Sequence, residues 1–272
     1  MDLSIVILNY KTKGFLKTCI RGIEMFQHGL NYEIIVVDNA SGDGSVEMIK
    51  EKFPQVKLIE SSENLGHAKG NNLGLKEAQG KYILLLNTDI AVLDGGIKKL
   101  YDFLELRADV GLAGAKLLNP DKTPQESCLR FPNKITPLYR RTFLGKLPLA
   151  RKELERYTMS DFNHDQSRPV EWVISSAIMV KREALEKVGL MDERFFIYFA
   201  DVDWCRRFWE NNYQVYYVAD APMVHYHRRE SAENSGLKAV TNPLARIHIK
   251  DWIKYLKKYK NSNLPKIYES QE

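Results

Sequence analysis

Short apolar runs alternate with amphipathic segments along the first third of the chain. The apolar runs are rich in β-branched residues, which is typical of strands buried on both faces. They predict strands at Leu3–Leu8, Glu33–Val37, Val56–Ile59 and Tyr82–Leu86. Helical spacing between the runs predicts helices at Gly14–Phe26, Ser45–Phe53 and His67–Ala78, and another helix capped by Asp94. This alternation predicts an α/β fold in which a mainly parallel sheet carries helices on both faces.

The alternation breaks between residues 119 and 169. This segment is rich in proline, and we interpret it as a long loop region with a short helix near 150–157. Beyond it we expect an apolar segment at Glu171–Val180, helices at Arg182–Val188 and Asp201–Glu210, and short strands at Val215–Val218 and Met223–Tyr226. The predicted organisation is one domain over residues 1–236, with a variable region 119–169 between halves 1–118 and 170–236, followed by a tail at 237–272.

The chain has a formal net charge of +5, and the excess lies in two segments. Residues 139–156 carry a net charge of +4, and residues 237–260 carry a net charge of +6. Apolar residues of the second segment follow helical spacing at Ile249, Trp252, Ile253 and Leu256. Such a basic amphipathic helix fits an anionic membrane surface, and it fits equally well a terminal helix packed on its own domain. Nucleic acid is not an expected partner, because no recognisable nucleic-acid motif accompanies the charge.

Cysteine usage and hydropathy predict the compartment. Cys19, Cys128 and Cys205 are far apart and odd in number, which argues against a paired metal clip and for a reducing environment. No stretch reaches the roughly 20 apolar residues of a membrane-spanning helix. The amino terminus has no basic region before its apolar run, so no signal peptide is expected. We expect a cytoplasmic protein whose basic tail is a candidate contact with the inner face of the cell membrane.

Polar residues follow three of the predicted strands. The strand ends carry Asn9-Tyr10, Asp38-Asn39 and Asn87-Thr88-Asp89. Ligands of open parallel sheets bind beyond these carboxyl ends, where a carboxylate can hold a divalent cation against phosphate oxygens. Asp38 or Asp89 taken alone is better explained as a cap or turn residue, but three polar strand ends at one edge favour a site. Neither a dinucleotide-binding glycine fingerprint nor a P-loop is present.

Glycines recur at four-residue spacing in the segment that follows the third strand. Gly66, Gly70 and Gly74 allow two interpretations. In one, they form a helix surface that packs tightly on the sheet. In the other, their backbone amides or the side chain of Lys69 lie near a phosphate. The pattern by itself does not choose between them.

A second polar concentration lies where an aromatic run meets the helix predicted at Asp201–Glu210. Asp201 and Asp203 stand at its start and fit either capping carboxylates or, because apolar burial raises a carboxyl pKa, a general base. His225 and His227 follow on a short strand. A lone histidine is more often structural, but one beside an aspartate near phosphates is a candidate metal ligand.

Several of these segments together resemble a known family. In order along residues 3–231 they read SIVILNY, VVDNASGDGS, ENLGHAKGNNLG, YILLLNTD, VGLMDERFFIYFADVDWCRR and VHYHRRES. They resemble family 2 glycosyltransferases, and within that family the bacterial rhamnosyltransferase-type enzymes that build surface polysaccharides. The resemblance does not cover residues 119–169 or the carboxyl-terminal tail.

The resemblance implies a GT-A fold, a nucleotide-diphosphate sugar donor and an inverting transfer assisted by Mg²⁺ or Mn²⁺. It implies that Asp201 is the catalytic base, with Ala200 where the family has a second acid. It implies that Asp89 is a metal ligand, joined by His225 or alternatively by His227. The expected substrate-binding residues are Asn9, Tyr10, Asp38, Asn39, Asn64, Lys69, Gly70, Asn71, Asn87, Thr88, Trp172, Ser175, Ser176 and Asp203.

The same resemblance gives dTDP-rhamnose as the first expected donor and a glycan or lipid-linked glycan as the acceptor. Residues 1–118 would then bind the donor, and residues 170–236 would bind the acceptor and carry the base. Two other functions are considered. A sugar nucleotidyltransferase would need a Gly-rich, Arg-bearing loop after the first strand, where this chain has Asn9-Tyr10-Lys11. A non-catalytic sugar-binding module would tolerate Asp201→Asn without losing its only activity.

Overall fold

A single mixed sheet organises the molecule. The computed structural model describes residues 1–26, 29–226 and 242–267. Nine strands form the main sheet in the order β3-β2-β1-β4-β10-β6-β11-β5, with β8 paired to β11. The strands are β1 (Leu3–Asn9), β2 (Tyr32–Asp38), β3 (Lys57–Glu60), β4 (Tyr82–Asn87), β5 (Ile90–Val92), β6 (Val110–Leu118), β8 (Arg168–Pro169), β10 (Ala177–Lys181) and β11 (Gln214–His225). Strands β7 (Cys128–Leu129) and β9 (Trp172–Val173) pair separately.

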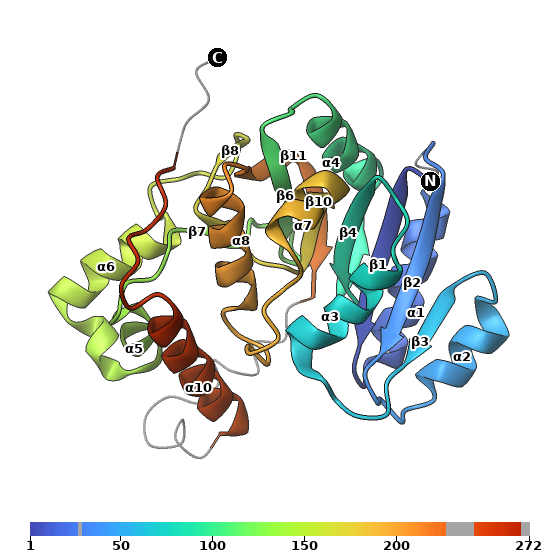
Figure 1. The fold of residues 1–272 in the computed structure, drawn as a ribbon, viewed down its shortest axis with the longest axis horizontal. Helices are drawn as coiled ribbons and strands as arrows, with labels where there is room; N and C mark the ends of the chain where they lie inside the picture. The colour runs from blue at the N-terminus through green and yellow to red at the C-terminus, as the bar shows by residue number, and fades with distance from the viewer. Residues whose placement is uncertain (27–28, 227–241, 268–272) are drawn as a thin grey trace.

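Helices cover both faces of this sheet (Figure 1). They are α1 (Lys13–Met25), α2 (Ser45–Lys52), α3 (Gly66–Glu77), α4 (Gly96–Glu105), α5 (Thr136–Arg141), the short η1 (Phe143–Lys146), α6 (Pro148–Thr158), α7 (Arg182–Val188), α8 (Ala200–Glu210) and α10 (Pro243–Lys258). Apolar residues of α1, α2 and α4 pack on one face, and those of α3, α7 and α8 pack on the other. The expected fold class is therefore confirmed.

Alternation along the strands divides the core into two clusters. Ile5 and Ile7 of β1 face the cluster with α1, while Val6 faces the cluster with α3. All three are fully buried. Burial on both faces explains why these strands read as continuous apolar runs in the sequence.

The second half of the sheet departs from the parallel pattern. Strand β10 is antiparallel to both of its neighbours, β4 and β6. Strand β6 has no counterpart among the predicted elements, because its glycines and alanines give a weak strand signal. The two short strands predicted near residue 220 form the single strand β11, with a register shift between Val218 and Pro222. The expected Asp94 cap is wrong, because α4 begins after Gly95 without a side-chain cap.

The proline-rich region is more regular than expected. It contains α5, η1, α6 and two short strands, and α6 includes the short helix expected near 150–157. Gln125 of this region contacts the main sheet, because its side chain donates to the carbonyl oxygen of His225 at 2.9 Å.

Helix α10 packs on the domain through a different face from the one predicted. Ile249 and Ile253 are 44% and 43% exposed, whereas Asp251 and Tyr255 are buried. Only Trp252 and Leu256 of the predicted apolar stripe are partly buried. Across the described residues, no helix combines the length and apolar composition of a membrane span.

Candidate active site

The carboxyl ends of β1 and β2 form a buried polar cluster. Asn9 donates to the Asp38 carboxylate at 2.8 Å and to the Ser41 hydroxyl at 2.9 Å. The backbone N–H of Ser41 donates to the other Asp38 oxygen at 3.0 Å. Asp38 is 3% exposed, and its carboxylate accepts these hydrogen bonds in the protein interior, where polar groups need partners. The bond from Ser41 fixes the loop that follows β2. Asn9, Asp38 and Ser41 therefore act as one rigid unit at the edge where a nucleotide is expected.

A threonine pair connects this cluster to the end of β4. The Thr12 hydroxyl donates to the Asn9 side chain at 2.8 Å and lies 2.9 Å from the Thr88 hydroxyl. Tyr10 is 43% exposed beside the cluster, and the Lys11 ammonium lies 5.3 Å from its ring centroid. The predicted residues of the β1, β2 and β4 ends thus lie together.

Asn39 holds the segment that leads into α3. Its side chain donates to Asn64 at 3.0 Å and accepts from the backbone N–H of Leu65 at 2.8 Å. Behind this segment, a Cβ added to Gly70 would lie 2.6 Å from Leu8, and one added to Gly74 would lie 2.3 Å from Val6. These two glycines therefore serve close helix–sheet packing, whereas Lys69 is exposed.

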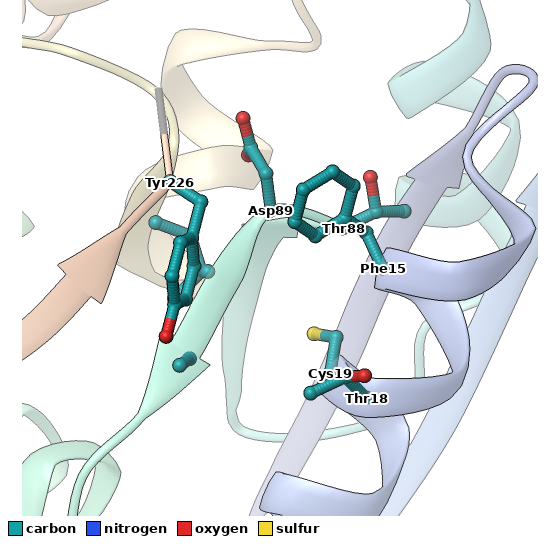
Figure 2. A pocket seen from close by; sticks show the side chains of 8 residues that line it. Phe15, Thr18, Cys19, Thr88, Asp89 and Tyr226 are labelled. Carbon is teal, nitrogen blue, oxygen red and sulfur yellow. The ribbon is translucent and has the colours of Figure 1, made fainter. Parts of the chain in front are cut away.

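Asp89 and His225 face one another just beyond β4. Asp89 Oδ2 lies 3.5 Å from His225 Nε2, and His225 Nδ1 lies 2.9 Å from the Gln125 side-chain oxygen. Because Gln125 Oε1 is an acceptor, it favours the tautomer with the proton on Nδ1, which presents the Nε2 lone pair to Asp89. Figure 2 shows Asp89 and Tyr226 among the side chains that line an adjoining cavity of about 220 Å³.

This pair suits a divalent cation bound together with a substrate. Two acceptor atoms at close range repel one another unless a proton or a cation lies between them. No cluster of three or more His, Cys, Asp and Glu side chains suited to a metal occurs in the described part of the chain. Mg²⁺ typically takes only one or two protein carboxylates and completes its shell with phosphate oxygens and water. The residues present fit that arrangement.

Asp201 lies in the first turn of α8 and is partly buried. Burial raises the pKa of its carboxyl to about 6, although hydrogen bonds from the backbone N–H groups of Val202 and Ser175 act in the opposite direction. The Val202 bond measures 2.9 Å. A carboxylate with a pKa near neutrality can take a proton from a hydroxyl group and release it again.

Consecutive serines join the Asp89 side of the site to the Asp201 side. The backbone N–H of Asn87 donates to the Ser176 carbonyl at 2.8 Å, and the Asn87 side chain donates to the Ser176 hydroxyl at 3.1 Å. Ser175 bonds to Asp201 through its backbone. Asp201 is thus bonded to the Ser175-Ser176 dipeptide, and Asp89 follows two residues after Asn87, which is bonded to the same dipeptide at the carboxyl end of β4.

Some predicted residues serve the scaffold. Asp203 is 0% exposed, accepts from Arg207 at 2.9 Å and from the Tyr259 hydroxyl at 2.8 Å, and also binds Lys258. Its carboxylate ties α8 to α10 within the protein interior. Trp172 is 6% exposed and its indole donates to the Arg130 carbonyl at 2.9 Å. The side chain of Asn71 bonds to the backbone of His67 in its own helix. His227 lies outside the described residues.

The structure also adds residues that the sequence analysis did not single out. Gln125 orients His225 from a region that the family resemblance does not cover. His67, next to the predicted residues of α3, lies 3.0 Å from the Ser175 hydroxyl, and burial lowers its pKa to about 4. A neutral His67 therefore supports the dipeptide that contacts Asp201. The sequence signal that could have identified His67 is its position inside the HAKGNN segment.

Comparisons with known proteins show the family of the chain. The family model for glycosyl transferase family 2 matches residues 4–189. An N-acetylglucosaminyl-diphospho-decaprenol L-rhamnosyltransferase of Mycobacterium tuberculosis is 26% identical over 204 residues, which cover 71% of this chain and 66% of that protein. A dTDP-rhamnosyl transferase of Shigella flexneri is 26% identical over 222 residues, 80% of this chain and 68% of that protein. The chain thus spans about two thirds of these relatives.

Solved structures share the fold. A mannosyltransferase from Pyrobaculum calidifontis in complex with GDP-Man and Mn²⁺ covers 97% of this chain and 65% of its own, with a TM-score of 0.61 and 17% identity. GalNAc-T7 with UDP, GalNAc and Mn²⁺ has a TM-score of 0.67 and 12% identity, and covers 96% of this chain and 48% of its own. At these identities the likeness establishes the GT-A fold alone.

We expect Asp201→Asn to stabilise the protein above pH 6. Between the ordinary pKa of 3.8 and the folded value of about 6, the folded protein keeps a proton that the unfolded chain releases. Stability from this group therefore falls as the pH rises, and asparagine removes the effect. The Tm of the variant should exceed that of the unsubstituted protein at pH 8, and the two should converge below pH 4.

Asp43→Asn is the control, because we expect it to change the stability at pH 8 in the opposite direction. Burial raises the pKa of the Asp43 carboxyl, but hydrogen bonds from Ser45 and the backbone of Lys13 outweigh it and lower the pKa overall. This variant should lose stability at pH 8, and the loss should disappear as the pH falls through the folded pKa. An equal effect of both substitutions on Tm at pH 8 would contradict the burial argument.

Proposed function

The chain belongs to glycosyl transferase family 2, and from this membership and the site we propose an inverting transfer of a sugar from a nucleotide-diphosphate donor. The observation that carries the proposal is the arrangement around Ser175-Ser176. Ser175 bonds to Asp201, whose carboxyl has a raised pKa, and Ser176 bonds to Asn87, which precedes Asp89 of the Asp89–His225 pair by two residues. A base and a diphosphate-binding end at one sheet edge are the two parts that such a transfer requires.

Asp201 is the proposed catalytic base. An acceptor hydroxyl is a weak nucleophile, and its proton must leave as the new glycosidic bond forms. Asp201 takes that proton, which contributes about 10²–10⁴-fold to the rate. Because the acceptor attacks opposite the leaving diphosphate in one step, a single base suffices and the anomeric centre inverts. Ala200 in place of a second acid leaves this role unchanged.

Asp89 and His225 are the proposed ligands of a divalent cation, Mg²⁺ or Mn²⁺. When bound, the cation would neutralise the charge that develops on the leaving diphosphate. Gln125 keeps the His225 ring in place, and Thr88 and Thr12 link this end of the site to the Asn9–Asp38 cluster. That cluster, with Tyr10 and Asn39, is proposed to hold the nucleoside part of the donor.

The proposed donor is dTDP-rhamnose and the proposed acceptor is a glycan or lipid-linked glycan of the cell surface. Both rest on the relatives, since one is named a dTDP-rhamnosyl transferase and another an L-rhamnosyltransferase of a diphospho-decaprenol-linked sugar. The activity of the whole protein is part of the proposal, because the chain spans only about two thirds of those relatives.

The outward face of α10 is proposed to touch an anionic membrane surface. Ile249 and Ile253 are exposed on it, and the neighbouring Lys250 and Lys257 are exposed as well. Apolar side chains between lysines suit the boundary between acyl chains and anionic headgroups. A contact of this kind would hold a cytoplasmic enzyme at the surface where a lipid-linked acceptor lies.

A panel of nucleotide sugars with added Mn²⁺ or Mg²⁺ tests the activity. We expect slow release of the nucleoside diphosphate from one donor, with rhamnose as the first candidate sugar. Asp201→Asn should lower transfer to acceptor by about 10²–10⁴-fold and leave donor binding intact, because it removes only the proton acceptor. Unsubstituted transfer rates from this variant would contradict the base assignment. Donor binding without transfer by the unsubstituted protein would favour a sugar-binding module instead.

Asp89→Ala tests the cation site separately. We expect calorimetry to register metal-dependent donor binding for the unsubstituted protein and a loss of that dependence in the variant. Gln125→Ala should lower the affinity for the metal by about 10–100-fold, because Gln125 orients the proposed ligand His225 through a hydrogen bond. Donor binding that is identical with and without Mn²⁺ in the unsubstituted protein would contradict the site.

Substitution of Ile249 and Ile253 by serine tests the membrane contact. We expect partition onto vesicles containing anionic phosphatidylglycerol to fall by about tenfold or more, because the two side chains no longer bury apolar area in the lipid. Leu106→Ser is the matched control, since Leu106 is 85% exposed at the end of α4. Equal partition of the double variant and this control would count against the contact.

A further inference from the structure

A buried aspartate of α10 holds the loop that leads into α8. Asp251 is 0% exposed, and its Oδ2 accepts from three consecutive backbone N–H groups, those of Phe196 at 3.0 Å, Ile197 at 3.1 Å and Tyr198 at 3.2 Å. Successive amides that converge on one anion form a charge-assisted nest, which is stronger than the same number of neutral hydrogen bonds. The bond partners are 53 to 55 residues apart in the chain.

This loop contacts the start of α3 as well as leading into α8. The Phe196 carbonyl accepts from the His67 backbone N–H at the start of α3. Gly66 has a φ of 78°, and a Cβ at this position would lie 2.4 Å from the Phe196 carbonyl oxygen, so the loop and α3 are in close contact. His67 in turn supports Ser175. The loop position therefore affects the dipeptide beside Asp201.

The loop also sets the first turn of α8. Phe199 adopts a left-handed conformation with a φ of 66°, which costs free energy for a residue with a bulky side chain. It is the N-cap of α8, and Asp201 follows two residues later. Surrounding contacts must hold Phe199 in this conformation, and α10 supplies them. The rings of His248 and Tyr255 lie 5.3 Å and 5.4 Å from the Phe199 ring.

We propose that Asp251 is a positioning residue for the transfer reaction, because its carboxylate fixes residues 196–198 and through them the turn that carries Asp201. The inference rests on the proposed role of Asp201 as the base. Lys254 balances the buried charge, since its ammonium donates to the other Asp251 oxygen at 2.9 Å. Helix α10 lies beyond residues 4–189, the part of the chain that the family model matches.

The expected kinetic effect is a loss of kcat without a loss of donor affinity. Within the described residues, no hydrogen bond joins Asp251 to the donor cluster around Asn9 and Asp38. Misplacing a catalytic group by about 1 Å can cost about 100-fold in rate. We therefore expect Asp251→Ala to lower kcat by about 10–100-fold and to change the donor KM by less than about twofold.

Two comparison variants separate positioning from stability. Asp251→Asn keeps one acceptor oxygen of the same reach, so it should recover part of the kcat that Asp251→Ala loses. Leu104→Ala removes fully buried apolar volume from α4 on the opposite face of the sheet and lowers Tm for unrelated reasons. At a temperature where all variants stay folded, Leu104→Ala should keep the unsubstituted kcat.

Hydrogen–deuterium exchange on the full chain provides a readout that needs no substrate. In Asp251→Ala we expect the amides of residues 196–198 to exchange about tenfold faster or more, and the start of α8 to follow. Exchange there that matches Leu104→Ala, or a kcat loss that follows Tm equally in both variants, would overturn the inference. If the unsubstituted protein transfers no sugar from any donor, the proposed function fails, and exchange alone then decides whether Asp251 holds the loop.

Discussion

The antiparallel pairing of β10 with β4 is the constraint on which the site depends. Because β10 runs against β4, its first residues lie beside the last residues of β4. Asn87 therefore meets Ser176 at the carboxyl end of β4, and Ser175 comes within hydrogen-bonding reach of Asp201. A parallel β10 would carry these serines to the opposite edge of the sheet. The joining of the two halves of the site follows from this one strand direction.

The proposed function of Asp201 and the stability of the fold oppose one another. The surroundings that raise its pKa are useful to a base that works near neutral pH, but they make its ionised form costly in the folded state. The rest of the site is built from satisfied polar groups, such as the Asn9–Asp38–Ser41 cluster and the Gln125–His225 pair. Those contacts fix side chains before a substrate arrives, so less ordering is needed on binding.

Helix α10 belongs to the domain more closely than its charge suggested. Asp251 caps the loop before α8, and Asp203 receives Lys258 and Tyr259 from the end of α10. The inward face of the helix thus holds the part that carries Asp201, the proposed base, while Ile249 and Ile253 are exposed on the outward face. The amphipathic pattern left two alternatives open, packing on the domain and contact with a membrane surface. They are compatible in one helix, because each would use a different face.

The sequence by itself determined the parallel half of the fold and the residues at its strand ends. Short apolar runs and helical periods are local signals, so β1, β2 and β4 were predicted together with Asn9, Asp38 and Asp89. It also marked Asp201, because the aromatic run before it implied burial. Only the tertiary structure decided the direction of β10, the contact of Gln125 with His225, and the burial of Asp203 and Asp251. Those features join residues far apart in the chain, and pairing over such distances depends on the packing of the whole core and leaves no periodic trace in the local sequence.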